Sequence, residues 1–356
     1  MGSGAGKYVV FGLIFVLALA IAGLITGAIG AGLTQSEADK ATGDTAEGPF
    51  IPKPEVHLPA QVIFPTSDRD HYREFLEAEA AEKAHGEEEL TPQQHELVDE
   101  GPYRGNNFII TNTILSSWIA SVVLVLLFAL GARKAALVPG RLQNFVEIAI
   151  EGLLNFVAGT VGREHSRMIF PVIATIFLFV IVNAWIGLLP IYPAWGFKDG
   201  DMIQIHLLRP AGTDINMPLA LALVSFVFVE GLGFKMLGVG YIGKFVRVGS
   251  LKRGIVAMFR LQVLDAFQYL LDFFFVGPLE AFSEMVRLIS FTFRLFGNMT
   301  AGEILVLVSA FLVPFVATVG VYGLELLVGF IQALIFSGLT LVFAAIAITE
   351  HKQEAH

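Results

Sequence analysis

Long apolar runs dominate this 356-residue sequence. Runs of about 18 or more apolar residues are typical of helices that cross a bilayer. With 55% hydrophobic and 15% charged residues, the chain is far from the composition of a soluble domain. The sequence therefore predicts an all-α polytopic membrane protein with about six membrane helices. These are expected at 8–33, 108–131, 168–189, 218–237, 279–313 and 315–349.

Charge is distributed unevenly along the chain. Residues 34–106 carry 17 acidic and 6 basic side chains, a balance of −11, which leaves +2 for the rest of a chain whose net charge is −9. We interpret 1–33 as an N-terminal membrane helix, 34–107 as an acidic outer-side extension and 108–356 as the membrane domain. A cleaved signal sequence is the alternative for 1–33, because GAIGA supplies small residues for cleavage.

Two surface helices are predicted in the extension. The first is TSDRDHYREFLEAEAAEKAHG, with Thr66 or Ser67 as its N-cap and Gly86 as its stop signal. The second is TPQQHELVDEG, in which Thr91 and Gln94 form a capping-box pattern with proline at the first helical position. We expect the extension to act as a cap or docking element rather than as part of a transport path.

Three further features concern the membrane domain. The amphipathic segment 142–163 is expected to lie along the membrane surface. The last two runs, at roughly 35 residues and about 50 Å each, exceed a hydrocarbon core of about 30 Å, so strongly tilted helices are expected. Basic clusters at 133–141 and 235–260 and in the C-terminal tail favour the cytoplasmic side. Both termini are then cytoplasmic, and residues 34–107 and 190–216 lie outside.

Polar residues interrupt the run at 279–313. At 100° per residue they share one helical face. An ionised side chain at mid-membrane costs at least about 2.5–3.5 kcal/mol, so it must face protein, water or a counter-charge. The members of this polar stripe are Glu280, Ser283, Arg287, Arg294 and Asn298.

Further acids lie toward the outer ends of the last two runs. Glu303 falls on the opposite helical face from Arg294, while Glu325 and Gln332 share a face of the next helix. A structural ion pair of Arg294 with Glu303 or Glu325 is one interpretation. The other is two polar half-pathways with Arg294 between them, where a permanent cation blocks a proton wire yet discharges a carboxylate brought by a partner.

Three segments resemble subunit a of the membrane (Fo) sector of F-type ATP synthases. They are RLFGNMTAGE, IQALIFSGLTLVFAAIAITEH and TDINMPLALAL, and the resemblance covers roughly 108–350. It implies that Arg294 is the stator arginine facing the ring of c subunits, and that Glu325 couples to Gly302. It assigns pathway positions to Asn298, Glu303 and Gln332, the inward exit to Glu280 and Ser283, and the outward inlet to Asp214 and Asn216.

The same resemblance implies partners and a location. It implies a c-subunit ring, b-type peripheral stalk subunits, and the inner (plasma) membrane of a bacterium. The absence of cysteine, the irregular histidine spacing and the lack of a P-loop pattern predict no metal, cofactor or ATP chemistry on this chain, and no nucleic acid is expected as a partner. A self-contained proton-coupled transporter and a non-conducting membrane scaffold are the alternatives. His206 is a candidate for proton entry, and Glu230 either lines the inlet or pairs with Lys235. The sequence leaves the coupling ion open between proton and sodium.

Overall fold

A computed structural model of the chain describes residues 3–27, 60–85, 90–103, 108–133, 139–189, 195–199, 202–245, 248–260 and 262–354. The predicted stop at Gly86 and the cleavage segment beyond Gly27 lie outside these residues. The chain forms two compact units. The first unit comprises Met1–Trp118, Asn183–Asp214 and Gly297–Phe330, and the second comprises Ile119–Val182, Ile215–Phe296 and Ile331–His356.

Within the part of the chain that the structure describes, five helical segments are long and apolar enough to cross a membrane, which confirms the all-α polytopic architecture. In the described part of α1 (Ser3–Thr26), the apolar stretch Ile14–Leu24 is shorter than a membrane span requires. A sixth span therefore stays a prediction. The five segments are α6 (Asn112–Ala132), α7 (Arg141–Gly187), α8 (Asn216–Leu237), the continuous Val263–Leu312, and α12 (Val316–Glu354) up to Ile348.

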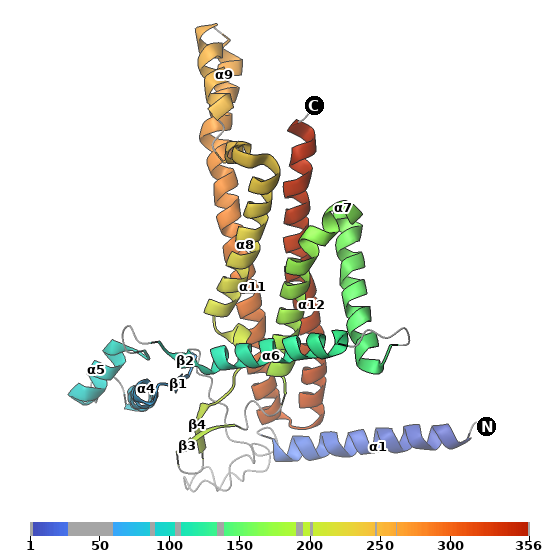
Figure 1. The fold of residues 1–356 in the computed structure, drawn as a ribbon. Coiled ribbons are helices and arrows are strands. Elements are labelled where there is room, and N and C mark those ends of the chain that lie inside the picture. The colour runs from blue at the N-terminus through green and yellow to red at the C-terminus, as the bar shows by residue number, and fades with distance from the viewer. Residues whose placement is uncertain are drawn as a thin grey trace. The chain divides into compact units, whose positions relative to one another are not determined.

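Helix α7 joins the predicted surface helix to the predicted third span. The backbone is helical on both sides of Gly162, whose φ of 78° lies in the left-handed region that glycine tolerates. The chain reverses there, and the two halves run back along each other (Figure 1). Val157 and Ile169, on either side of the reversal, belong to one buried cluster. The helical backbone resumes directly after Gly162, so the span predicted at 168–189 lies within the second half of α7.

The core of the second unit lies between α7, α8 and α12. Its buried side chains are aliphatic and small, so the three helices approach closely. The members are Val157, Ile169, Ile173, Val229, Leu232, Leu341, Ala344, Ala347 and Ile348.

The basic stretch after α8 is helical. It forms the 3₁₀ turn η3 (Gly238–Lys244) and α9 (Val248–Phe259), and α9 packs along α10 (Val263–Leu271) in Figure 1. A π-helical turn, η4 (Asp272–Val276), then leads into α11 (Gly277–Leu312), so Pro278 does not interrupt the helix.

In the first unit, the extension folds around a short sheet. Strand β1 (Val62–Phe64) pairs antiparallel with β2 (Ile110–Thr111), directly before α6. Helix α4 (Thr66–His85) begins where the cap was predicted, with Thr66 and Ser67 both in its first turn. Helix α5 (Pro92–Glu100) has the predicted capping box, in which Thr91 and Gln94 bond to each other's backbone.

A hairpin of β3 (Gly196–Asp199) and β4 (Met202–His206) packs on this sheet. Val62, Tyr72 and Ile205 form a buried cluster that joins the extension to the hairpin. The guanidinium of Arg69 lies 4.3 Å from the centre of the Phe197 ring, a cation–π contact. The extension is thus docked onto the loop between α7 and α8.

The end of α1 contacts the turn between α11 and α12. Gly23 and Gly27, four residues apart, leave no room for a Cβ against the carbonyl oxygens of Pro314 and Leu312. Glycines at this spacing let helices approach at backbone distance within a membrane.

Candidate functional site

Glu303 of α11 is held by an arginine from the loop before α8. Arg209 Nε donates to both carboxylate oxygens of Glu303 at 3.0 and 3.1 Å, and Arg209 Nη2 donates to Oε2 at 2.8 Å. The Arg209 side chain is 7% exposed and that of Glu303 is 20% exposed. This geometry is the strong, bidentate form of a carboxylate–guanidinium contact.

The loop that carries Arg209, between residues 207 and 215, is held in place by a backbone hydrogen bond and by close packing. The Arg209 N–H donates to Ser116 Oγ at 3.1 Å. Pro210, next in the chain, fits against Gly187, where a side chain would collide with the proline ring. Gly212 packs in the same way against Met299 of α11, because an added Cβ would lie 2.7 Å from Met299 Cγ.

Asp214 lies at the end of the same loop. It follows the 3₁₀ turn η2 (Ala211–Thr213), and its carboxylate accepts a hydrogen bond from Thr113 Oγ1 at 2.9 Å. Asn216 is the exposed first residue of α8. Of the two predicted inlet residues, Asp214 is therefore tied to the start of α6, and Asn216 opens the next helix.

Glu325 of α12 faces Gly302 of α11. Its carboxylate occupies the space where a Cβ on Gly302 would stand. The neighbouring part of α12 is fixed by α7, because Trp185 Nε1 donates to the Leu326 carbonyl at 3.0 Å and Gly329 fits against Ala184. The structure thus brings Glu303 to Arg209 and Glu325 to Gly302.

A second charge cluster lies in the second unit, between α8 and α11. Arg287 forms an ion pair with Glu284, one turn earlier on α11, and lies 3.6 Å from Glu230 of α8. All three side chains are at most 15% exposed. Glu230 therefore pairs with Arg287 and not with Lys235, whose Nζ lies 3.3 Å from Met168 Sδ.

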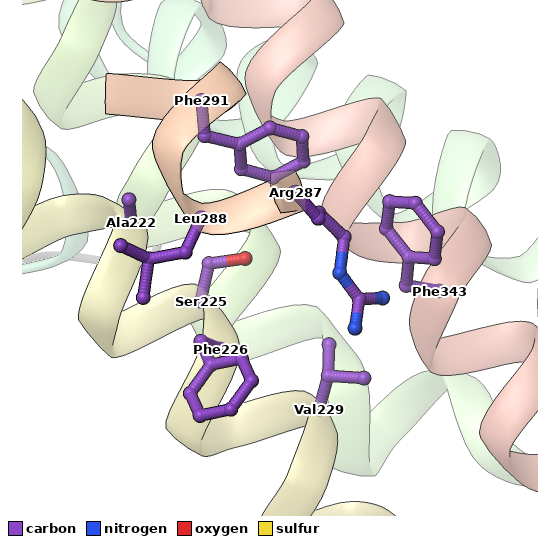
Figure 2. Close-up of a pocket in the computed structure, with 8 residues that line it drawn as sticks. All are labelled: Ala222, Ser225, Phe226, Val229, Arg287, Leu288, Phe291 and Phe343. Carbon is purple, nitrogen blue, oxygen red and sulfur yellow. The ribbon is translucent and has the colours of Figure 1, made fainter. Parts of the chain in front are cut away.

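A small cavity adjoins this cluster. Figure 2 shows the Arg287 guanidinium pointing between Val229 and the ring of Phe343, whose centre is 3.9 Å away. The cavity volume is about 10 Å³, close to the minimum for one water molecule. Nearby, Ser225 and Thr340 share a hydrogen bond of 2.7 Å. The lining residues are Ala222, Ser225, Phe226, Val229, Arg287, Leu288, Phe291 and Phe343.

Arg294 lies seven residues after Arg287 on α11 and nine before Glu303. It is half-buried, its Nη2 donates to Ser290 Oγ at 3.4 Å, and its guanidinium lies 5.9 Å from the centre of the Phe291 ring. Both contacts are to its own helix, α11.

The remaining predicted residues differ in exposure. Asn298 and Ser283 are exposed on α11, and Ser283 Oγ donates to the Leu279 carbonyl at 2.8 Å. Glu280 is half-buried in the first turn of α11, and Gln332 of α12 is buried at 2% exposure. Glu280, Ser283 and Arg294 share the second unit with Gln332.

Comparison with known proteins identifies the family of this chain. The chain matches the family described as ATP synthase A chain over residues 114–345. It is 32% identical to ATP synthase subunit a of Solidesulfovibrio magneticus over 256 residues, which is 69% of this chain and 92% of that protein. It is also 34% identical to ATP synthase subunit a 3 of Pelobacter propionicus over 67% of this chain and 87% of that protein.

The chain belongs to the ATP synthase subunit a family. The predicted resemblance is thereby confirmed. A subunit a is the proton-translocating stator subunit of the Fo sector and carries no ATP chemistry itself, as the sequence indicated. The chain is a multi-pass protein of the bacterial inner membrane, and its family implies contact with a c-ring and a peripheral stalk.

Two parts of this subunit a were missed from sequence. Arg209 carried a usable signal, since it is the one charge in HLLRP, just before a membrane helix. Glu284 is the second, and its signal was its place three residues before Arg287, a spacing at which helical side chains meet. His206 was predicted to aid proton entry. The His206 backbone bonds to the Gln61 and Asn112 side chains, and a role of this residue in proton entry stays a prediction.

Proposed function

We propose that this subunit a conducts protons through two offset half-channels, with Arg294 as the barrier between them. The outer half-channel runs from Asp214 and Asn216 through Asn298, Glu303, Glu325 and Gln332. The inner one leaves by Ser283 and Glu280. Arg294 faces the c-ring and draws the proton from each arriving rotor carboxylate, because a nearby cation favours the charged form of a carboxyl group.

One observation carries this proposal, namely the separate partners of the charges along α11. Glu303 is neutralised by Arg209, and Arg287 is neutralised by Glu284 and Glu230. Arg294, between them on the same helix, makes its described contacts only within α11. A half-buried guanidinium that can accept another partner suits a carboxylate that comes and goes with the rotor.

The partner assignment has a direct test. A tag at the C-terminus of this chain should co-purify, from detergent-solubilised membranes, a ring of proteolipid c subunits together with b-type stalk subunits. Purification of the chain alone, from membranes that synthesise ATP, contradicts the assignment.

The two half-channels have a second test, which uses the absence of cysteine from the sequence. Asn298→Cys should make ATP-driven pumping sensitive to a membrane-impermeant thiol reagent added from outside, and Ser283→Cys to the same reagent added from the cytoplasmic side. Phe282→Cys, next to Ser283 and also exposed, is the matched control. Equal sensitivity from both sides at either position contradicts two offset half-channels.

The N-terminal helix α1 is proposed to stay in the mature protein, with both termini in the cytoplasm and residues 34–107 outside. The close approach of Gly23 and Gly27 to Pro314 and Leu312 supports retention, because cleavage after α1 would remove a packed helix. N-terminal sequencing of the purified subunit tests it, and a mature start beyond residue 27 contradicts it.

A further inference from the structure

A chain of hydrogen bonds begins in the extension, at Gln61. Gln61 Oε1 accepts from the His206 N–H at 2.7 Å and from Asn112 Nδ2 at 3.3 Å, while the Gln61 N–H donates to Asn112 Oδ1 at 3.1 Å. The Asn112 N–H in turn donates to the Gln61 carbonyl at 3.0 Å. Gln61 is 3% exposed and Asn112 is fully buried. These bonds connect three segments that are far apart in sequence.

The chain continues from Asn112 to Glu303. Ser116 Oγ donates to the Asn112 carbonyl at 2.8 Å and accepts from the Arg209 N–H at 3.1 Å. The Arg209 guanidinium then holds the Glu303 carboxylate. The position of the Arg209 backbone, and with it the reach of the guanidinium, therefore depends on the residues that Gln61 fixes.

A parallel branch reaches Asp214. Thr111, in the strand that pairs with β1, shares a hydrogen bond of 2.8 Å with Thr113, and Thr113 donates to Asp214 at 2.9 Å. Burial, and next the charge of Asp214, raises the pKa of Tyr103 to about 12. The Tyr103 hydroxyl donates to the Ala60 carbonyl at 2.7 Å, beside Gln61. The extension is thus connected by hydrogen bonds to the residues that hold Glu303 and Asp214.

We infer that the extension is a positioning element for the outer half-channel, and that Gln61 is its key positioning residue. Gln61 and Ala60 precede the family match at 114–345, so these contacts come from a part of the chain outside that match. This role goes beyond a cap, because it sets where Arg209 and Asp214 stand relative to Glu303. The inference rests on the proposed function, in which Glu303 and Asp214 carry protons from outside.

The test uses the intact ATP synthase in proteoliposomes, with the lumen equivalent to the cell exterior. ATP synthesis is measured against luminal pH at fixed medium pH and fixed membrane potential, per assembled complex. Gln61→Leu removes the acceptor of the His206 N–H and one of the two acceptors of Asn112 Nδ2. The variant enzyme should need a luminal proton concentration roughly three- to tenfold higher to reach its half-maximal rate. This factor corresponds to the free energy of one lost hydrogen bond. The response to medium pH should not change.

Gln94→Leu is the matched control, because it makes the same substitution in the exposed capping box of α5 and should leave the luminal half-point unchanged. Tyr103→Phe deletes only the hydroxyl donor to Ala60, and should shift the luminal half-point in the same direction by less. If the complex with Gln61→Leu does not assemble, the luminal half-point of the Tyr103→Phe enzyme tests the inference instead.

A luminal half-point identical to that of the unmodified enzyme overturns the inference, even if less complex assembles or the maximal rate falls. Such a result shows that the extension contributes only structure. Continued pumping by an Arg294→Ala variant overturns the proposed function instead, so the two failures can be told apart.

Discussion

Arg209 binds Glu303 through both carboxylate oxygens, and the two residues come from segments 94 positions apart. The pair is largely buried within the first unit. Because Glu303 and Glu325 both lie toward the outer ends of neighbouring helices, we predict that they share a proton. That coupling stays a prediction, and the structure adds that a fixed cation stands beside one of the two acids. A proton that enters from outside and binds Glu303 therefore has to compete with the Arg209 guanidinium for its carboxylate.

Removing Arg209 should be more damaging than replacing it with a similar charge. Arg209→Ala leaves the Glu303 carboxylate without its cation, a change that costs about 3 to 5 kcal/mol for buried pairs. Arg209→Lys keeps the charge and loses the bidentate contact, so an intermediate effect is expected. The readouts are the amount of assembled complex and ATP-driven pumping per complex. Full assembly and full pumping by Arg209→Ala would show that charge and geometry at this position do not matter.

Gly302→Ala should slow pumping by displacing the Glu325 carboxylate, which occupies the space of the missing Cβ. The shorter side chain in a Gly302→Ala/Glu325→Asp double variant should recover part of the rate, because it withdraws from the new methyl group. Gly323→Ala is the control, since open space surrounds that glycine. A double variant no faster than Gly302→Ala alone argues against the steric account.

Glu280→Gln should reduce pumping without abolishing it. Glu284, four residues further along α11, is the nearest carboxylate that could replace it, yet it forms an ion pair with Arg287. Water at the cytoplasmic end is then the remaining route, so the loss should become larger as cytoplasmic buffer is diluted. Pumping assays in inverted vesicles at several buffer concentrations measure this, with Glu151→Gln on the exposed face of α7 as control. Full loss with intact assembly means that Glu280 is indispensable.

Membrane orientation can be read from single cysteines in this cysteine-free chain. Gln93→Cys, exposed on α5, should react with an impermeant thiol reagent only from outside the cell. Lys252→Cys, exposed on α9, should react only in inverted vesicles. Reaction of both from the same side contradicts the orientation that the basic clusters indicate.

Local chemistry made part of the structure predictable. Thr91, Pro92 and Gln94 fix the start of α5 within four residues, so the capping box could be identified from sequence alone. The spans of α8 and α12 follow from apolar runs whose ends are marked by polar residues. The stripe containing Arg294 follows from helical periodicity.

Tertiary contacts were not predictable in the same way. Arg209 finds Glu303 only because Gly187 and Gly212 let the loop pack closely on its neighbours. Glu230 meets Arg287 rather than Lys235 because of how α8 rotates against α11, which no spacing within one helix encodes. Periodicity gives the face on which a charge lies, and the packing of the neighbouring helix decides its partner.

The central claim is that Arg294 is the permanent cation between two proton half-channels, and ATP-driven acidification of inverted membrane vesicles containing Arg294→Ala tests it most directly. Pumping per assembled complex should be abolished. Arg294→Lys should not restore it fully, because an amine can lose its proton where it is desolvated. Arg163→Ala, exposed on α7, should pump normally. Pumping by Arg294→Ala at the rate of the unmodified enzyme, with the c-ring bound, would contradict the account.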